Sequence, residues 1–185
     1  MITHQDARSS MEAIESTMNR AARGLGYRQS APHLLLWGAI WFVGYGLNGV
    51  LSGPQWHWLG LLAIGIPGSA WLGMRSARNL RQSEHRGLFK YALSSLVAMA
   101  FFASLLAILP PLDGRQVGAM LPLIVAAIYG ITGIWGDRPR LALVGLAVAL
   151  LVLTGYFLLP DHFNPIMAVA GGGALILGGL WMRKW

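Results

Sequence analysis

Histidine and carboxylate side chains are the groups in this sequence most able to bind a metal ion, and three of them lie at the ends of apolar segments. His57, Asp161 and His162 could together hold a divalent cation, because imidazole and carboxylate groups are frequent ligands of such ions. The spacings typical of metal motifs, such as HxxH and HExxH, are absent from the sequence. We therefore interpret these side chains as interfacial polar residues, and we predict no metal and no cofactor.

Other kinds of catalytic site are missing as well. The sequence has no cysteine, which excludes thiolate catalysis and thiolate metal ligands. It contains neither a phosphate-binding loop nor a dinucleotide-binding fingerprint. Ser69, in the stretch IPGSAWLG, has no histidine in the interior of an apolar segment that could serve as its general base. We predict that the chain is not an enzyme.

The elements that carry these residues are six long apolar runs. They cover residues 34–51, 56–74, 88–109, 117–135, 141–159 and 163–182. A helix of about 20 apolar residues crosses the hydrocarbon core of a bilayer, whereas helices of soluble proteins keep a polar face and strands of a membrane barrel alternate. The sequence therefore predicts an all-α polytopic membrane protein. Its six-helix transmembrane domain occupies 31–185 and follows a cytoplasmic amphipathic helix at 1–30.

The positive charges predict the orientation in the membrane. Of the 14 lysine and arginine residues, 12 lie before the first run, after the sixth, or in the connections between runs two and three and runs four and five; Lys90 lies at the start of the third run, on the same side, and only Arg115 lies on the other side. Because the cytoplasmic side of membrane proteins carries the excess of these residues, we expect both termini in the cytoplasm. This bias accounts for the net charge of +7, so no nucleic-acid partner is predicted. The preference for arginine over lysine and the short loops indicate a bacterial inner membrane.

The connections predicted on the outer side are short: SGPQ, PPLDGR and PDHFNP. Proline and glycine favour tight turns there, so we expect the six helices to form three antiparallel hairpins. Small residues in the later helices let backbones approach closely, and the residues predicted to pack in this way are Gly130, Gly133, Ala170, Ala174 and Gly178. The likeness among the hairpins fits either a threefold repeat of a two-helix unit or the general similarity of glycine-rich spans.

The second helix of each predicted hairpin ends in a similar way, with AIGIPGSAWLGMR, AAIYGITGIWGDR and GGGALILGGLWMRK, and the first helix begins with LLLWGAIWFVGYGLNGVL. Over residues 34–182, this layout resembles the HdeD-like, short-repeat family of six-helix bacterial membrane proteins. The resemblance implies an inner-membrane protein of a family associated with acid-stress resistance. It carries no catalytic motif.

Ionisable side chains are absent from the interior of all six runs. Ion-driven carriers usually need such groups within the membrane, so active transport is disfavoured and a passive channel or facilitator for an ion or a neutral solute stays open. Tyr45, Asn48 and Ser69 are among the polar residues that do lie inside the runs. We expect them to form hydrogen bonds between helices, since an amide or hydroxyl in lipid needs a partner.

The first helix carries apolar residues at heptad steps: Ala7, Met11, Ile14, Met18, Ala21 and Leu25. We expect Gly24 and Gly26 to break this helix before the membrane. Three interpretations of the helix compete: it lies on the lipid surface, it packs under its own bundle, or its larger apolar residues Met11, Ile14, Met18 and Leu25 dock a partner. The balance between its acidic residues and its arginines weakens the first interpretation, because surface helices are strongly basic.

Two hypotheses of function follow. In the favoured one, the chain is a non-enzymatic membrane protein that associates with itself, as a homo-oligomer, or binds a cytoplasmic protein. The first helix and a basic loop would form the contact, and the loop arginines are Arg75, Arg78, Arg81 and Arg86. In the other hypothesis, the six helices form the wall of a small channel. In both, the surrounding partner is the lipid bilayer.

The predicted orientation can be measured with reporter fusions in the membrane. A reporter joined after residue 113 should read as external, and a reporter joined after residue 81 should read as cytoplasmic, because arginine is concentrated on the cytoplasmic side. The same location for both reporters would contradict the six-span topology.

Overall fold

A computed structural model describes residues 4–51, 55–78, 101, 104–105, 108–109 and 113–184, and this part of the chain is helical without any strand. The predicted all-α class is therefore confirmed for the described residues. The helices are α1 (His4–Asn48), α2 (His57–Arg78), α4 (Gly114–Trp135) and α5 (Pro139–Leu153). The last apolar segment consists of η3 (Pro160–His162), α6 (Phe163–Ile166), η4 (Met167–Gly172) and α7 (Gly173–Arg183), and it follows η2 (Thr154–Leu158). The predicted third span, 88–109, lies almost entirely outside the described residues.

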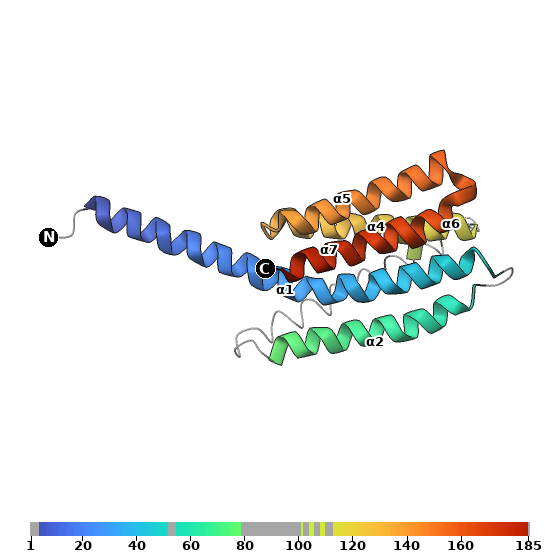
Figure 1. Cartoon of the computed structure of the whole chain (residues 1–185), viewed down its shortest axis with the longest axis horizontal. Helices are drawn as coiled ribbons and strands as arrows, with labels where there is room; N and C mark the ends of the chain where they lie inside the picture. The colour runs from blue at the N-terminus through green and yellow to red at the C-terminus, as the bar shows by residue number, and fades with distance from the viewer. Residues whose placement is uncertain are drawn as a thin grey trace.

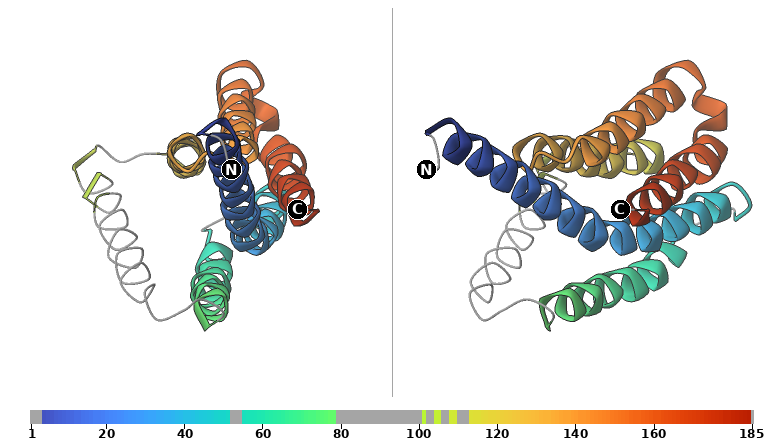
Figure 2. Two further views of the ribbon diagram at one scale, coloured as in Figure 1. Left: turned by 90° about the vertical axis from the view of Figure 1, so that its left-hand side faces the viewer. Right: turned by 60° about the vertical axis from the view of Figure 1, so that its left-hand side comes forward.

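The helices pack side by side, with α1 joining the other elements (Figure 1). One face of α1 contacts η4 and α7, another contacts α2, and α4 packs along α5, which in turn contacts α7. The N-terminal part of α1 extends away from these helices, and Figure 2 shows the same projection from two further sides. The bundle therefore covers only the second half of its longest helix.

Three helical stretches are long and apolar enough to cross a membrane: Gly114–Trp135, Pro139–Leu158 and Pro160–Arg183. They correspond to the predicted runs 117–135, 141–159 and 163–182. The runs 34–51 and 56–74 are helical over most of their length, in α1 and α2. The chain thus has the helix lengths and the composition of a membrane protein.

The predicted helix break at Gly24 and Gly26 is wrong, because α1 runs without interruption from His4 to Asn48 and even contains Pro32. Each glycine costs about 1 kcal/mol in a helix and proline about 3 kcal/mol, so tertiary contacts must offset these costs. Tyr27 and Ala31 are buried in the bundle immediately after the glycines. Packing of these side chains keeps the chain helical where local propensity favours an end.

The face of α1 inside the bundle repeats at steps of four and three residues: Tyr27, Ala31, Leu34, Gly38, Trp41 and Tyr45 are all buried. Gly38 allows a close approach of two backbones, because a Cβ atom at this position would lie 3.0 Å from the carbonyl oxygen of Gly172. The contact is close on the other side as well, since a Cβ atom added at Gly172 would lie 2.9 Å from the carbonyl oxygen of Gly38. The two glycines bring the backbones of α1 and η4 together.

A hydroxyl group completes the backbone hydrogen bonding of α4. Pro122 lies inside this helix and has no N–H group, so the carbonyl of Gly118, four residues earlier, loses its usual donor. The Tyr45 hydroxyl donates to that carbonyl at 2.6 Å. The bond joins α1 to α4 and satisfies a polar group in an apolar setting.

Asn48 also has the partners expected for an amide in lipid. Its Oδ1 atom accepts from Trp58 Nε1 at 3.1 Å, and its Nδ2 atom donates to Asn164 Oδ1 at 3.5 Å. Ser69 accepts a hydrogen bond from Trp37 Nε1 at 2.9 Å. These contacts confirm the predicted hydrogen bonds between helices for Tyr45, Asn48 and Ser69.

Replacing the tyrosine tests the role assigned to its hydroxyl. Tyr45→Phe should lower the free energy of unfolding by about 1–2 kcal/mol, because the Gly118 carbonyl is left without a donor. In a Pro122→Ala background, the restored N–H group supplies a donor to the Gly118 carbonyl. Tyr45→Phe should therefore lower the free energy of unfolding by clearly less in that background. Denaturant unfolding in mixed micelles measures both values. Equal costs in the two backgrounds would contradict this explanation.

Candidate functional site

The projecting part of α1, residues 4–26, is called the arm here. Its larger apolar side chains, Met11, Ile14, Met18 and Leu25, are between 59% and 72% exposed. Such exposure is unusual for a row of large apolar residues in an aqueous setting, because their burial is what normally stabilises an amphipathic helix. The predicted docking residues therefore form one uncovered row along the arm.

A second exposed row lies further along α1, after Pro32 and Leu36, which are half-buried on the same line of the helix, Leu36 against Gly68 of α2. Ala39, Val43, Gly46 and Val50 are exposed and follow the same steps of four and three residues. A Cβ atom at Gly46 would meet nothing within 4 Å. We call the arm residues and these four positions together the outer stripe.

The outer stripe and the bundle-facing residues lie on different sides of α1. Each residue of an α-helix turns the chain by about 100°, which places Ile14 and Met18 on roughly the opposite side from Leu34 and Gly38. The arm therefore directs its apolar row away from the face that packs on its own bundle. This geometry disfavours the interpretation in which the arm packs under the bundle.

Contacts at the base of the arm join three elements. The backbone N–H of Arg140, in α5, donates to the Tyr27 hydroxyl of α1 at 3.3 Å. The Arg140 guanidinium donates to the Trp181 carbonyl at 3.0 Å and lies 4.4 Å from the centre of the Trp181 ring. A cation suits this position, because the last carbonyls of a helix lack backbone donors and carry partial negative charge.

A second arginine packs on the arm side of the same region. The Arg138 guanidinium occupies the space where a Cβ atom of Gly26 would lie, so a larger residue at this point of α1 would have to displace the end of the arginine side chain. Arg138 follows a turn in which Asp137 has a positive φ of 51°. We call Tyr27, Arg138, Arg140 and Trp181 the junction, since they connect α1 to α5 and α7.

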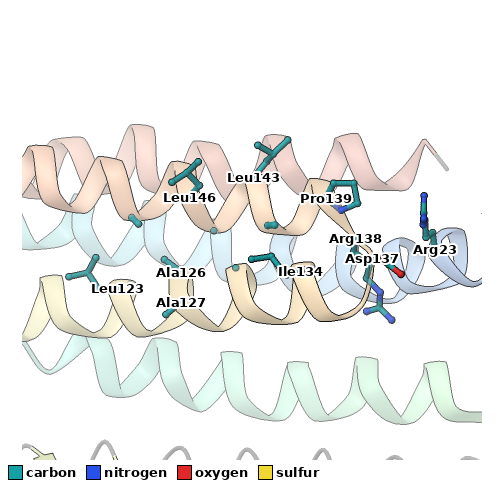
Figure 3. A pocket seen from close by; sticks show the side chains of 15 residues that line it. Arg23, Leu123, Ala126, Ala127, Ile134, Asp137, Arg138, Pro139, Leu143 and Leu146 are labelled. Atoms are coloured by element: carbon teal, nitrogen blue, oxygen red, sulfur yellow. The ribbon is translucent and has the colours of Figure 1, made fainter.

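A groove of about 900 Å³ runs between α4 and α5. Figure 3 shows Leu123 toward one end and Asp137 and Arg138 at the turn that closes the other, with Arg23 beyond them and its side chain pointing to the other side from that of Arg138. Its floor is made by small residues: a Cβ atom at Gly133 would lie 2.8 Å from Ala142 Cα, and one at Gly145 would lie 2.6 Å from the Ala126 carbonyl oxygen. The close approach of the helices therefore depends on glycine.

The predicted packing residues occupy different environments. Gly133 lies against α5, and a Cβ atom at Gly178 would lie 2.6 Å from Val144 Cγ2. Ala170 and Ala174 are half-buried in the last apolar segment. A Cβ atom at Gly130 would meet nothing within 4 Å, because it faces the open groove.

The basic loop is described only at its beginning. Arg75 is exposed and lies 5.3 Å from the centre of the Trp71 ring, and Arg78 is the last residue of α2. Arg81 and Arg86 lie outside the described residues.

The weak metal candidates are separated between two elements. His57 begins α2, whereas Asp161 and His162 belong to η3. In the described ranges, no three His, Cys, Asp or Glu side chains come together as a metal-binding group.

The junction was not predicted from the sequence. From the sequence, Arg138 and Arg140 are two of the positive charges between the fourth and fifth runs, and no role is predicted for Tyr27 or Trp181. The signal that could have found them is the pair of arginines around Pro139, because proline in the first turn marks the start of a helix and so places both arginines at that start.

Comparison of the chain with protein-family models, curated proteins and solved structures finds no match. The resemblance to HdeD-like proteins therefore stays a prediction.

Two glycines of α4 provide a matched pair for testing the floor of the groove. Gly133→Ala should lower the free energy of unfolding by about 1–3 kcal/mol, because the added methyl group overlaps Ala142. Gly130→Ala should instead raise it by about 0.5–1 kcal/mol, since alanine favours the helix and the methyl group meets open space. Thermal unfolding in detergent compares the two. Similar effects of both substitutions would contradict the packing described.

Proposed function

We propose that this chain is a six-span membrane protein, built from three hairpins with both termini in the cytoplasm, that acts by assembling through the outer stripe of α1. The observation that carries the proposal is the row of large apolar side chains that the continuous helix holds uncovered beyond the bundle. Burial of such a row against a second helix is the way heptad patterns gain stability.

A second copy of the chain is the partner that best fits the stripe. Two copies in the same membrane extend their arms in the same direction, so identical rows can meet as parallel helices. Confinement to the membrane raises the effective concentration of one arm near another, which helps a short seam to pair. Met11 and Met18 adapt to an opposing surface, and Ala39 and Gly46 let backbones approach within the lipid.

The alternative partner is a cytoplasmic protein with an apolar groove for the arm. A seam rich in methionine also suits that mode of binding. The channel hypothesis stays a hypothesis, because no observation on the described residues favours it over assembly.

Cross-linking tests self-association directly, since the natural chain has no cysteine. Ile14→Cys in the arm and Val43→Cys in the membrane part should form disulfide-linked dimers on mild oxidation of intact membranes. Ser16→Cys is the matched control, because Ser16 is equally exposed but lies on the other side of the helix. It should yield far less dimer.

Three results would count against self-association through the outer stripe. Equal cross-linking at Ser16 and Ile14 would indicate random collision. Absence of dimer at both stripe positions would exclude self-association through the stripe and would favour a cytoplasmic partner. A dimer that persists after Ile14→Lys and Met18→Lys together would show that the arm does not contribute, since those charges cannot be buried unpaired at low cost.

A further inference from the structure

We propose that the groove between α4 and α5 binds an anionic phospholipid of the cytoplasmic leaflet, with the phosphate at Arg23 and Arg138 and an acyl chain along the apolar floor. The inference rests on the predicted membrane orientation and not on assembly through α1. Its failure would therefore leave the proposed self-association untouched.

The length of the groove is apolar. Its walls are formed by Leu123, Ala127, Ile134, Leu143 and Leu146, above the glycines at the helix contact. Its volume of about 900 Å³ lies within the range of pockets that bind organic molecules. Both helices belong to stretches long enough to cross a membrane, so the apolar walls of the groove are suited to a hydrocarbon chain.

One end of the groove is charged, and the charge is positive on balance. Arg23 and Arg138 stand there with one carboxylate, Asp137 (Figure 3). Within the described ranges, neither arginine forms an ion pair with Asp137 within 4.0 Å. The Nε atom of Arg138 is buried without a hydrogen-bond partner. This nitrogen faces Gly26 of α1, and the charge of the guanidinium adds to the positive potential at this end of the groove.

The start of α5 strengthens the attraction for an anion at this end. Pro139 is the first residue of α5, so the positive end of the helix dipole lies beside the two arginines. The predicted orientation places this turn at the cytoplasmic surface, at the depth of the lipid headgroups. Basic pockets between transmembrane helices on this side are suited to anionic headgroups.

A phospholipid fits both parts of the groove better than a helix does. A helix from a second copy could fill the apolar length but would not complement the charge. The cytoplasmic ends of this chain's other helices carry arginine, for example Arg75 and Arg183, and would bring like charge to Arg23 and Arg138. A lipid supplies a chain for the floor and an anion for the charged end in one molecule.

Binding of phosphatidylglycerol and phosphatidylcholine with identical acyl chains to the purified full chain tests the inference, with native mass spectrometry as the readout. The natural chain should prefer phosphatidylglycerol. Arg23→Gln and Arg138→Gln should each weaken its binding by about tenfold, through loss of a charge-assisted contact. Arg28→Gln is the matched control on α1, since Arg28 is exposed and lies outside the groove, and it should leave the preference unchanged.

A substitution that fills the groove tests the contribution of the acyl chain to binding separately from that of the headgroup. Gly130→Leu places a side chain in the open groove and should weaken the binding of both lipids. Soluble glycerol phosphate should not displace the lipid, because it lacks the acyl chain.

Any of four results would overturn the inference: no preference for phosphatidylglycerol, an equal loss in Arg28→Gln, unchanged binding in Gly130→Leu, or displacement by glycerol phosphate alone. Arg23 is exposed, so Arg23→Gln keeps the test valid even if Arg138→Gln fails to fold.

Discussion

The structure depends on the helicity of α1 between Gly24 and Pro32. Two glycines and a proline favour a helix end in this stretch, yet the helix continues. What holds it is the packing that begins immediately afterwards, with Tyr27 and Ala31 buried in the bundle and Tyr27 hydrogen-bonded to α5. If these contacts were lost, the arm would become a separate helix on a flexible connection. With them, the arm keeps a defined direction relative to the bundle.

This continuity determines which surfaces are free. One side of α1 is covered by α7 and η4 and another by α2, whereas the outer stripe lies on the side opposite α7 and η4, in the arm and again in the membrane part. The junction also connects the arm with the groove, since Arg138 contacts Gly26 of the arm and is one of the residues that line the groove. The proposed protein contact and the proposed lipid site therefore lie on different surfaces but share one structural support.

Sequence reasoning predicted the helical class and the need of Asn48 for partners, because composition and the cost of an unpaired amide in lipid are properties of the residues themselves. It failed at Gly24 and Gly26, where a local preference was outweighed by burial that only the fold creates. It could not separate Gly130 from Gly133, since spacing places both on one helix face and only the crossing of α5 distinguishes them. A hydrogen bond from Tyr45 to another helix was predicted. Its acceptor, the Gly118 carbonyl, was not, because that carbonyl is free only on account of Pro122 in α4.

The most direct test of the account is the distance between two spin labels on α1. Labels at Ser16→Cys and Ala39→Cys occupy exposed positions in the arm and the membrane part. One continuous helix separates their backbones by about 35 Å, at 1.5 Å for each residue. Pulsed electron paramagnetic resonance in lipid should therefore give one narrow distribution near that distance. A broad distribution, or a main distance far below it, would mean that the helix bends at the glycines and would contradict the account.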